Sequence, residues 1–197
     1  MDFIDQINAA PRKGLRKLVA LAGPPASGKS TLAENIAQRL NAQVVPMDGF
    51  HLDNAILAKR GLLDRKGAPE TIDAAGFVHM VRRLRDEQDV IYPLFDRTRD
   101  LAIAGAGHID ATCRTVVIEG NYLLHDADIW RDLHDLWDFS IRLQVSESIL
   151  RDRLIARWTD HGLSADEAAV RADGNDLRNA RTMASAHLSA DLTIESK

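Results

Sequence analysis

The sequence lacks the features of a secreted, membrane-spanning or nucleic-acid-binding protein. It contains a single cysteine, Cys113, among 197 residues, which excludes an internal disulfide framework and any C-x-x-C metal or redox motif. No apolar run approaches the ~18 residues that a membrane span needs. The net charge is −4, whereas nucleic-acid-binding domains are usually basic. We therefore expect a cytoplasmic protein with neither a membrane nor a nucleic acid as partner.

The rest of the composition is that of a globular protein. Hydrophobic residues make up 45% and charged residues 27% of the chain, and both values are ordinary for a soluble protein. A chain of this size buries about 70% of its unfolded surface, so it can fold without a disulfide or a structural metal. The length favours one domain spanning residues 1–197.

The pattern of apolar residues predicts strands that alternate with helices. Leu18–Ala22 is a short apolar run without alternation, which is typical of a strand buried on both faces of a parallel sheet. The other predicted strands are 43–47, 90–95, 115–118, 139–145 and 192–194, and the predicted helices are 28–40, 73–87 and a segment around 150–158. This alternation predicts an α/β fold, a three-layer α/β/α sandwich with a mainly parallel sheet.

Two details of the predicted sheet follow from glycine and proline. Pro46 has no N–H to donate, so the strand that contains it should lie at a sheet edge or end there. Apolar residues on both sides of Gly105-Ala106-Gly107 predict a small hairpin that turns at these glycines.

The clearest chemical signal is a phosphate-binding loop. The pattern G-x-x-x-x-G-K-[ST] is matched by Gly23, Pro24, Pro25, Ala26, Ser27, Gly28, Lys29, Ser30 and Thr31. Glycines let the backbone wind closely around a polyphosphate, and its N–H groups then form an anion-binding nest. The loop follows a buried strand and opens a helix, which directs the positive end of the helix dipole at the same phosphates. We expect Lys29 to reach the β- and γ-phosphate oxygens of ATP.

A magnesium site is expected beside this loop. The Ser30 hydroxyl is one candidate ligand. Glu119 directly follows the apolar strand Val116–Ile118, and in open α/β sheets the ligand crevice lies at the carboxyl ends of the strands. Ser30 and Glu119 are therefore predicted to hold Mg²⁺, and a surface glutamate at a strand end is the alternative for Glu119.

Motifs that are missing narrow the class of phosphate-binding protein. The sequence has no N-K-x-D, which a guanine-specific GTPase needs, and no L-S-G-G-Q, which marks ABC-type ATPases. Asp64-Arg65-Lys66-Gly67 matches D-x-x-G but follows no apolar strand, so we interpret it as coincidence. A small-molecule kinase remains, for which the chain offers a base and mobile cations.

Asp48 is the candidate base, and two arginines are the candidate cations. Asp48 follows the second strand and can accept a proton from an acceptor hydroxyl; an aspartate that caps a turn is the alternative. Arg153, Arg157 and His161 follow one face of a helix at i, i+4 and i+8. They predict a lid over about residues 151–178 that closes on ATP and neutralises the transferring phosphoryl group; a solvated helix face is the alternative.

Several motifs together resemble one group of P-loop kinases. They are the loop GPPASGKST at 23–31, Met47-Asp48-Gly49-Phe50-His51, Gly67-Ala68-Pro69-Glu70-Thr71-Ile72-Asp73, Tyr92-Pro93-Leu94-Phe95-Asp96 and Ile118-Glu119-Gly120-Asn121-Tyr122. From about residue 17 to residue 194 the chain resembles the uridine kinase, phosphoribulokinase and pantothenate kinase group. Within that group it is most similar to bacterial proteins described as fructose transport system kinases, or fructokinase-like.

The resemblance implies roles for matched positions. Asp48 matches the proton-accepting aspartate, and Asp73 matches an aspartate that holds acceptor hydroxyls in uridine kinases. His51, Phe95 and Asp96 fall at positions that line the acceptor pocket.

The acceptor side also departs from the family pattern. His51 stands where uridine kinases carry an aromatic residue. Arg97 and Arg99 stand where nucleoside kinases have aromatic and histidine residues, which argues against a pyrimidine base and for a smaller, more polar or anionic acceptor. A solvated charge run is the alternative for both arginines.

The sequence thus predicts a magnesium-dependent phosphotransferase that uses ATP on a hydroxyl of a small polar metabolite, such as a sugar like fructose. The alternatives are a nucleoside, pantothenate or glycerate kinase, and a nucleotide-binding hydrolase or regulatory protein without an acceptor. Asn175 and Asn179 are candidates either for contact with adenine or for helix capping. The preference between ATP and GTP stays open, and the sequence neither indicates nor excludes a homodimer.

Overall fold

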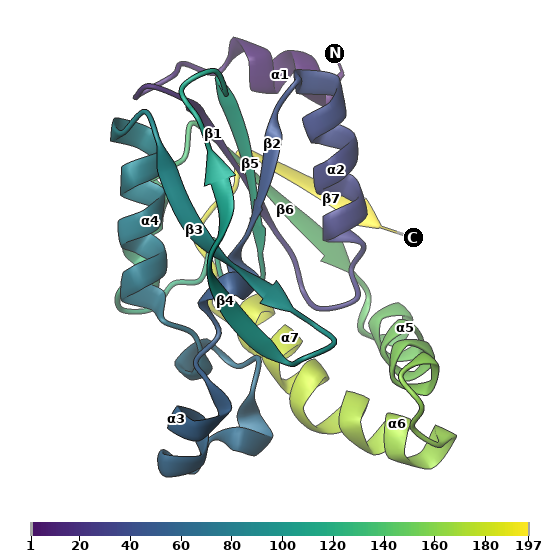
Figure 1. Cartoon of the computed structure of the whole chain (residues 1–197). Coiled ribbons are helices and arrows are strands. Elements are labelled where there is room, and N and C mark those ends of the chain that lie inside the picture. Colours follow the sequence, from purple (N-terminus) through teal and green to yellow (C-terminus); the bar gives the residue numbers. More distant parts are fainter. Residues whose placement is uncertain (1, 197) are drawn as a thin grey trace.

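A five-stranded parallel sheet forms the centre of the computed structural model, which describes residues 2–196 (Figure 1). The strand order is β2-β5-β1-β6-β7. The strands are β1 (Lys17–Ala22), β2 (Gln43–Pro46), β5 (Thr115–Gly120), β6 (Phe139–Val145) and β7 (Leu192–Ser196). β2 lies at an edge, as Pro46 predicted, and all neighbouring strands of this sheet pair in parallel.

Helices cover both faces of the sheet, so the predicted three-layer α/β fold is confirmed. The apolar side chains of β1 divide between the two layers. Leu18 and Ala20 belong to the core beneath α4 (Ala74–Asp86), and Val19 and Leu21 to the core beneath α1 (Phe3–Ala9) and α2 (Lys29–Leu40). This division explains why the strand sequence is apolar without alternation.

The C-terminal helices form a unit of their own below the sheet (Figure 1). They are α5 (Glu147–Asp160), α6 (Ala165–Arg171), the π-helical turn η5 (Ala172–Asp176) and α7 (Leu177–Ser185). A small core that includes Leu150, Leu154 and Leu177 holds α5 against η5 and α7, and Ala26 of the phosphate-binding loop packs on it. The predicted lid, about 151–178, lies within this unit, which begins one helical turn earlier.

The hairpin turns at a different place from the one predicted. β3 (Val90–Asp96) pairs antiparallel with β4 (Leu101–Ile109), and the turn is formed by residues 97–100. Gly105 and Gly107 lie within β4 instead. A Cβ at Gly107 would collide with the ring of Tyr92, so this glycine admits a buried aromatic ring rather than a chain reversal. Because the turn lies at residues 97–100, it contains Arg97 and Arg99.

Short helices occupy two connections: four lie between β2 and α4, and one lies between β5 and β6. They are η1 (Met47–Phe50), α3 (Asn54–Lys59), η2 (Leu63–Arg65), η3 (Pro69–Thr71) and η4 (Trp130–Leu136). Among residues 2–196, no helix has both the length and the apolar character that crossing a membrane requires.

Candidate active site

The phosphate-binding loop joins β1 to α2 and has the backbone that its sequence demands. Gly28 has a φ of 87° and precedes the first residue of α2, Lys29, a conformation that glycine adopts without strain. At Gly23 an added Cβ would lie 3.0 Å from Ser27 Oγ and 3.1 Å from Leu143 Cβ. The two motif glycines therefore serve different needs, one of conformation and one of close packing.

Glu119 lies at the carboxyl end of β5, directly beside this loop. Its side chain is buried, and its Oε1 accepts a hydrogen bond of 3.3 Å from Ser30 Oγ. Burial raises the pKa of Glu119, the nearby Lys29 ammonium lowers it, and the Asp48 carboxylate raises it again. Glu119 thus lies at the meeting point of the loop lysine, the loop serine and the candidate base.

The residues around Glu119 fit a magnesium ion. Glu119 Oε2 is buried and has no hydrogen-bond partner among the described residues 2–196, although a buried acceptor is normally satisfied. No group of three or more His, Cys, Asp or Glu residues in the described part of the chain could enclose a metal by itself. Mg²⁺ commonly takes only one or two protein oxygens and completes its shell with water and substrate phosphates, which matches Ser30 and Glu119.

Glu119→Gln is expected to stabilise the ligand-free protein at neutral pH. Because burial raises the folded-state pKa of Glu119, the wild type loses stability as pH rises from the unfolded value near 4.5 through the folded value. A neutral amide avoids that loss, so Tm should rise by about 2–4 °C at pH 7–8, corresponding to roughly 1 kcal/mol. The gain should shrink as pH falls towards 4.5.

Thermal melts across pH 5–8 check this prediction, with Glu34→Gln on the exposed surface of α2 as the control. Mg·ADP should raise the Tm of the wild type and of the control, and raise that of Glu119→Gln much less. A lower Tm for Glu119→Gln at pH 8 would mean that its carboxylate stabilises the empty site.

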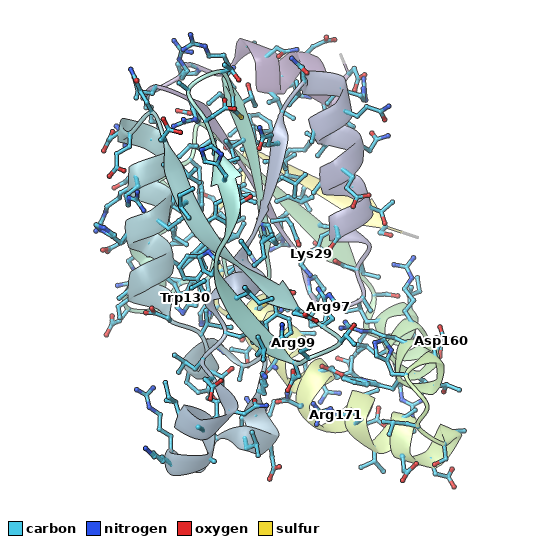
Figure 2. The ribbon with its side chains drawn as sticks, viewed as in Figure 1. Lys29, Arg97, Arg99, Trp130, Asp160 and Arg171 are labelled. Carbon is cyan, nitrogen blue, oxygen red and sulfur yellow. The ribbon has the colours of Figure 1, made fainter. Side chains whose placement is uncertain are left out.

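Asp48 lies in η1, immediately after β2, and it is paired with the hairpin turn. Arg97 Nη2 donates a hydrogen bond of 2.7 Å to Asp48 Oδ2. Figure 2 shows Lys29, at the start of α2, and Arg97, in the turn, close together at the carboxyl end of the sheet, and both influence Glu119. Arg97 therefore pairs with the candidate base, and its contact with an acceptor stays a prediction.

An aromatic wall stands next to Asp48. The His51 ring packs against the Phe95 ring with centroids 4.9 Å apart, and His51 Nδ1 lies 2.7 Å from the Asp48 carbonyl oxygen. Lys66 Nζ lies 5.3 Å from the centroid of Phe95 on the same wall. In the sequence, Lys66 stands out only as part of the D-x-x-G match at 64–67.

Both predicted lid arginines reach the site from α5. Arg153 Nη1 donates a hydrogen bond of 3.3 Å to the carbonyl oxygen of Ser27 in the phosphate-binding loop. Burial lowers the pKa of Arg157, the Arg97 guanidinium lowers it further, and Asp176 and Asp48 raise it. Helix α5 therefore places Arg153 at the phosphate-binding loop and Arg157 within electrostatic range of Asp48.

Comparison with known proteins identifies the family. The AAA domain family model matches residues 19–172. The chain belongs to this family of P-loop proteins.

Three relatives illustrate the match. "Uncharacterized protein YggC" of Escherichia coli K12 is 38% identical over 196 residues, with 92% of this chain and 80% of the relative covered. "Putative uridine kinase C227.14" of Schizosaccharomyces pombe is 31% identical over 195 residues, with coverage of 91% and 83%. The crystal structure of a "putative fructose transport system kinase" from Silicibacter sp. TM1040 is 53% identical, with a TM-score of 0.94 and coverage of 98% and 99%.

Other relatives are named as pantothenate kinases, and a phosphoribulokinase shares the fold. The resemblance to the uridine kinase, phosphoribulokinase and pantothenate kinase group is thus confirmed.

In this protein, two of the residues predicted to line the acceptor pocket have local structural roles. Asp73 caps α4, with its Oδ1 accepting from the Gly76 N–H at 2.9 Å, and it lines an open cavity of about 690 Å³ that also borders Trp130. Asp96 Oδ1 accepts from the Arg99 N–H at 3.0 Å within the hairpin turn. Contact of Asp73 or Asp96 with an acceptor stays a prediction.

Asn175 and Asn179 do not cap helices. Arg65 Nη1 donates to Asn175 Oδ1 at 2.5 Å, and Arg65 Nη2 donates to Asn179 Oδ1 at 3.1 Å. Both asparagines are buried, and Asn179 lies inside α7. Capping was therefore the wrong interpretation, because a long-range partner takes the side-chain oxygens, and contact with adenine remains untested.

Proposed function

We propose that this protein transfers the γ-phosphoryl group of ATP to a hydroxyl of a small polar metabolite. The observation that carries the proposal is the position of Asp48. Its carboxylate is bonded to Arg97 and acts electrostatically on the buried Glu119, and its backbone carbonyl contacts His51, whose ring packs on Phe95. A kinase needs its general base within reach of both the acceptor hydroxyl and the phosphate-binding loop, and Asp48 is the candidate for that position.

The residues of the chain divide the work of the reaction. The backbone N–H groups of the loop from Ala26 to Thr31 and the Lys29 ammonium would hold the triphosphate. Ser30 and Glu119 would hold Mg²⁺, which when bound neutralises charge on the phosphate oxygens. Asp48 takes the proton of the acceptor hydroxyl. The acceptor oxygen bonds to the γ-phosphorus as its bond to the β–γ bridging oxygen breaks, and ADP leaves.

Arg153 and Arg157 act on the transferring group. Arg153 already contacts the loop, and Arg157 lies within electrostatic range of Asp48 and Arg97. Cations at these positions offset the charge on the equatorial oxygens and the leaving oxygen. The rate gain would come from this charge neutralisation and from the alignment of the two substrates.

A sugar is the acceptor class that we favour. The acceptor side of the site presents Arg97 and His51 where nucleoside kinases present other side chains, so hydrogen bonds to hydroxyl groups dominate over stacking on a base. The relative from Silicibacter carries fructose in its name.

A coupled ADP-release screen tests the proposal. The panel should contain sugars including fructose, sugar acids, nucleosides, pantothenate and glycerate, each with Mg·ATP. We expect one hydroxyl compound to raise ADP release well above the acceptor-free rate. ADP release that no compound stimulates would favour an ATP hydrolase or a regulatory nucleotide-binding protein, and stimulation by a nucleoside, pantothenate or glycerate would replace the sugar.

A further inference from the structure

The hairpin turn that presents Arg97 is exposed, and its last residue, Asp100, is held by side chains from another segment. The side chains of Arg97 and Asp100 are 57% and 56% exposed. Asp100 has a φ of 53°, a left-handed conformation that a non-glycine residue adopts at some cost. Such a turn would be among the more mobile parts of a fold unless another group fixed it. The contacts of Asp100 therefore help to set the position of Arg97, together with the ion pair between Arg97 and Asp48.

Lys66 is the group that holds Asp100. Lys66 Nζ lies 2.8 Å from the Asp100 carbonyl oxygen, 2.8 Å from Asp100 Oδ2 and 2.7 Å from Asn54 Oδ1. These three acceptors use all three donors of the ammonium group. Asn54 Nδ2 closes the arrangement with a hydrogen bond of 3.0 Å to Asp100 Oδ2. With 12% of its side chain exposed, Lys66 is a directed contact rather than a loose surface ion pair.

The backbone of Lys66 is fixed from the opposite direction. Asn175 Nδ2 donates to the Lys66 carbonyl oxygen at 2.9 Å, and the Tyr122 hydroxyl donates to the Gly67 carbonyl oxygen at 2.6 Å. Asn175 belongs to η5, the π-helical turn between α6 and α7, and π-turns often occur at functional sites. One chain of hydrogen bonds thus runs from the C-terminal helices through Lys66 to the turn that carries Arg97.

The geometry points to Lys66 as a positioning residue that sets the place of Arg97 over Asp48, with Asn175 holding Lys66 in turn. Lys66 bonds neither Asp48 nor the phosphate-binding loop. Its effect on catalysis passes through the hairpin turn, and this part of the inference rests on the proposed function. Its effect on the order of the turn does not.

Hydrogen exchange tests the structural part without any substrate. In Lys66→Met, backbone amides of residues 96–102 should exchange about tenfold faster than in the wild type, because the anchored turn is released. Lys66→Arg should restore much of the protection, and Lys59→Met, at an exposed lysine of α3, should leave it unchanged. Unchanged exchange in Lys66→Met would overturn the inference. If that variant does not fold, Asp100→Asn removes the charge pair but keeps the carbonyl contact with Lys66, so exchange in the turn should rise in the same direction by a smaller factor. Exchange no faster than in the wild type would then overturn the inference.

Kinetics with the acceptor found by the screen test the catalytic part. Lys66→Met should lower kcat roughly 10- to 100-fold and leave the affinity for Mg·ADP unchanged. In an Arg97→Ala background the same substitution should have little further effect on kcat, because both changes act on one contact. Fully additive losses would overturn the route through Arg97. Failure of the screen would count against the proposed kinase activity and leave the exchange result to decide the role of Lys66.

Discussion

Asp48→Asn is expected to lower kcat by about 10²–10⁴-fold, the usual contribution of a positioned general base. The amide keeps the size of the carboxylate and can still accept a hydrogen bond from Arg97 through its oxygen, as Oδ2 does at 2.7 Å in the wild type. It cannot take the proton of the acceptor hydroxyl. Because Asp48 lies in η1, outside the phosphate-binding loop, the dissociation constant of Mg·ADP should change little, and calorimetry measures it independently of turnover.

The matched control for Asp48→Asn is Asp86→Asn, at a carboxylate of α4 that is 70% exposed. It should match the wild type in both kcat and Mg·ADP affinity. A kcat for Asp48→Asn within a few-fold of the wild type would remove Asp48 from the mechanism. Loss of Mg·ADP affinity together with kcat would instead assign Asp48 to nucleotide or metal binding.

Lys29→Ala should be the second most damaging change, and it should affect the nucleotide as well as the reaction. Without the ammonium, the charge that develops on the phosphate oxygens loses a preorganised partner. We expect kcat/KM for ATP to fall by about 10²–10³-fold, the effect of removing one such donor. Nucleotide affinity should fall too, because in the proposed mechanism Lys29 contacts the phosphates before and during transfer.

Lys29→Ala also has an electrostatic signature in the empty protein. Lys29 lowers the pKa of Glu119 against the effect of burial, so its removal should raise that pKa further. The variant should therefore melt below the wild type at pH 7–8, with the difference shrinking as pH falls. Lys59→Ala on α3 serves as the control. Wild-type kcat/KM in Lys29→Ala would exclude the lysine from phosphate binding.

Comparing the two variants separates binding from chemistry. Asp48→Asn should change kcat alone, and Lys29→Ala should change kcat, the KM for ATP and the affinity for Mg·ADP together. This contrast follows from their places in the fold, since one residue follows β2 and the other opens α2.

Local sequence sufficed where a few neighbouring residues dictate the backbone. The apolar run in β1, the glycines at positions 23 and 28, and the stop of α2 at Asn41, which adopts a φ of 50°, each depend on neighbours within a few positions. Where a side chain's partner comes from a distant segment, local patterns failed. Gly107 suggested a turn and instead makes room for Tyr92, and Asn175 suggested a cap and instead bonds Arg65 and the Lys66 backbone.

The sequence by itself determined the phosphate-binding loop and the parallel sheet, because their signals lie in short runs of neighbouring residues. It also predicted Asp48 as the candidate base. Only the tertiary structure decided that Arg97 reaches Asp48 and that Lys66 anchors the turn carrying Arg97, since these pairs are separated by 49 and 34 positions. The residues next to a loop lysine or arginine in the sequence do not determine which carboxylate or carbonyl it pairs with. Its partner is set by which carboxylates and carbonyls the packing of the hairpin and α3 brings within reach.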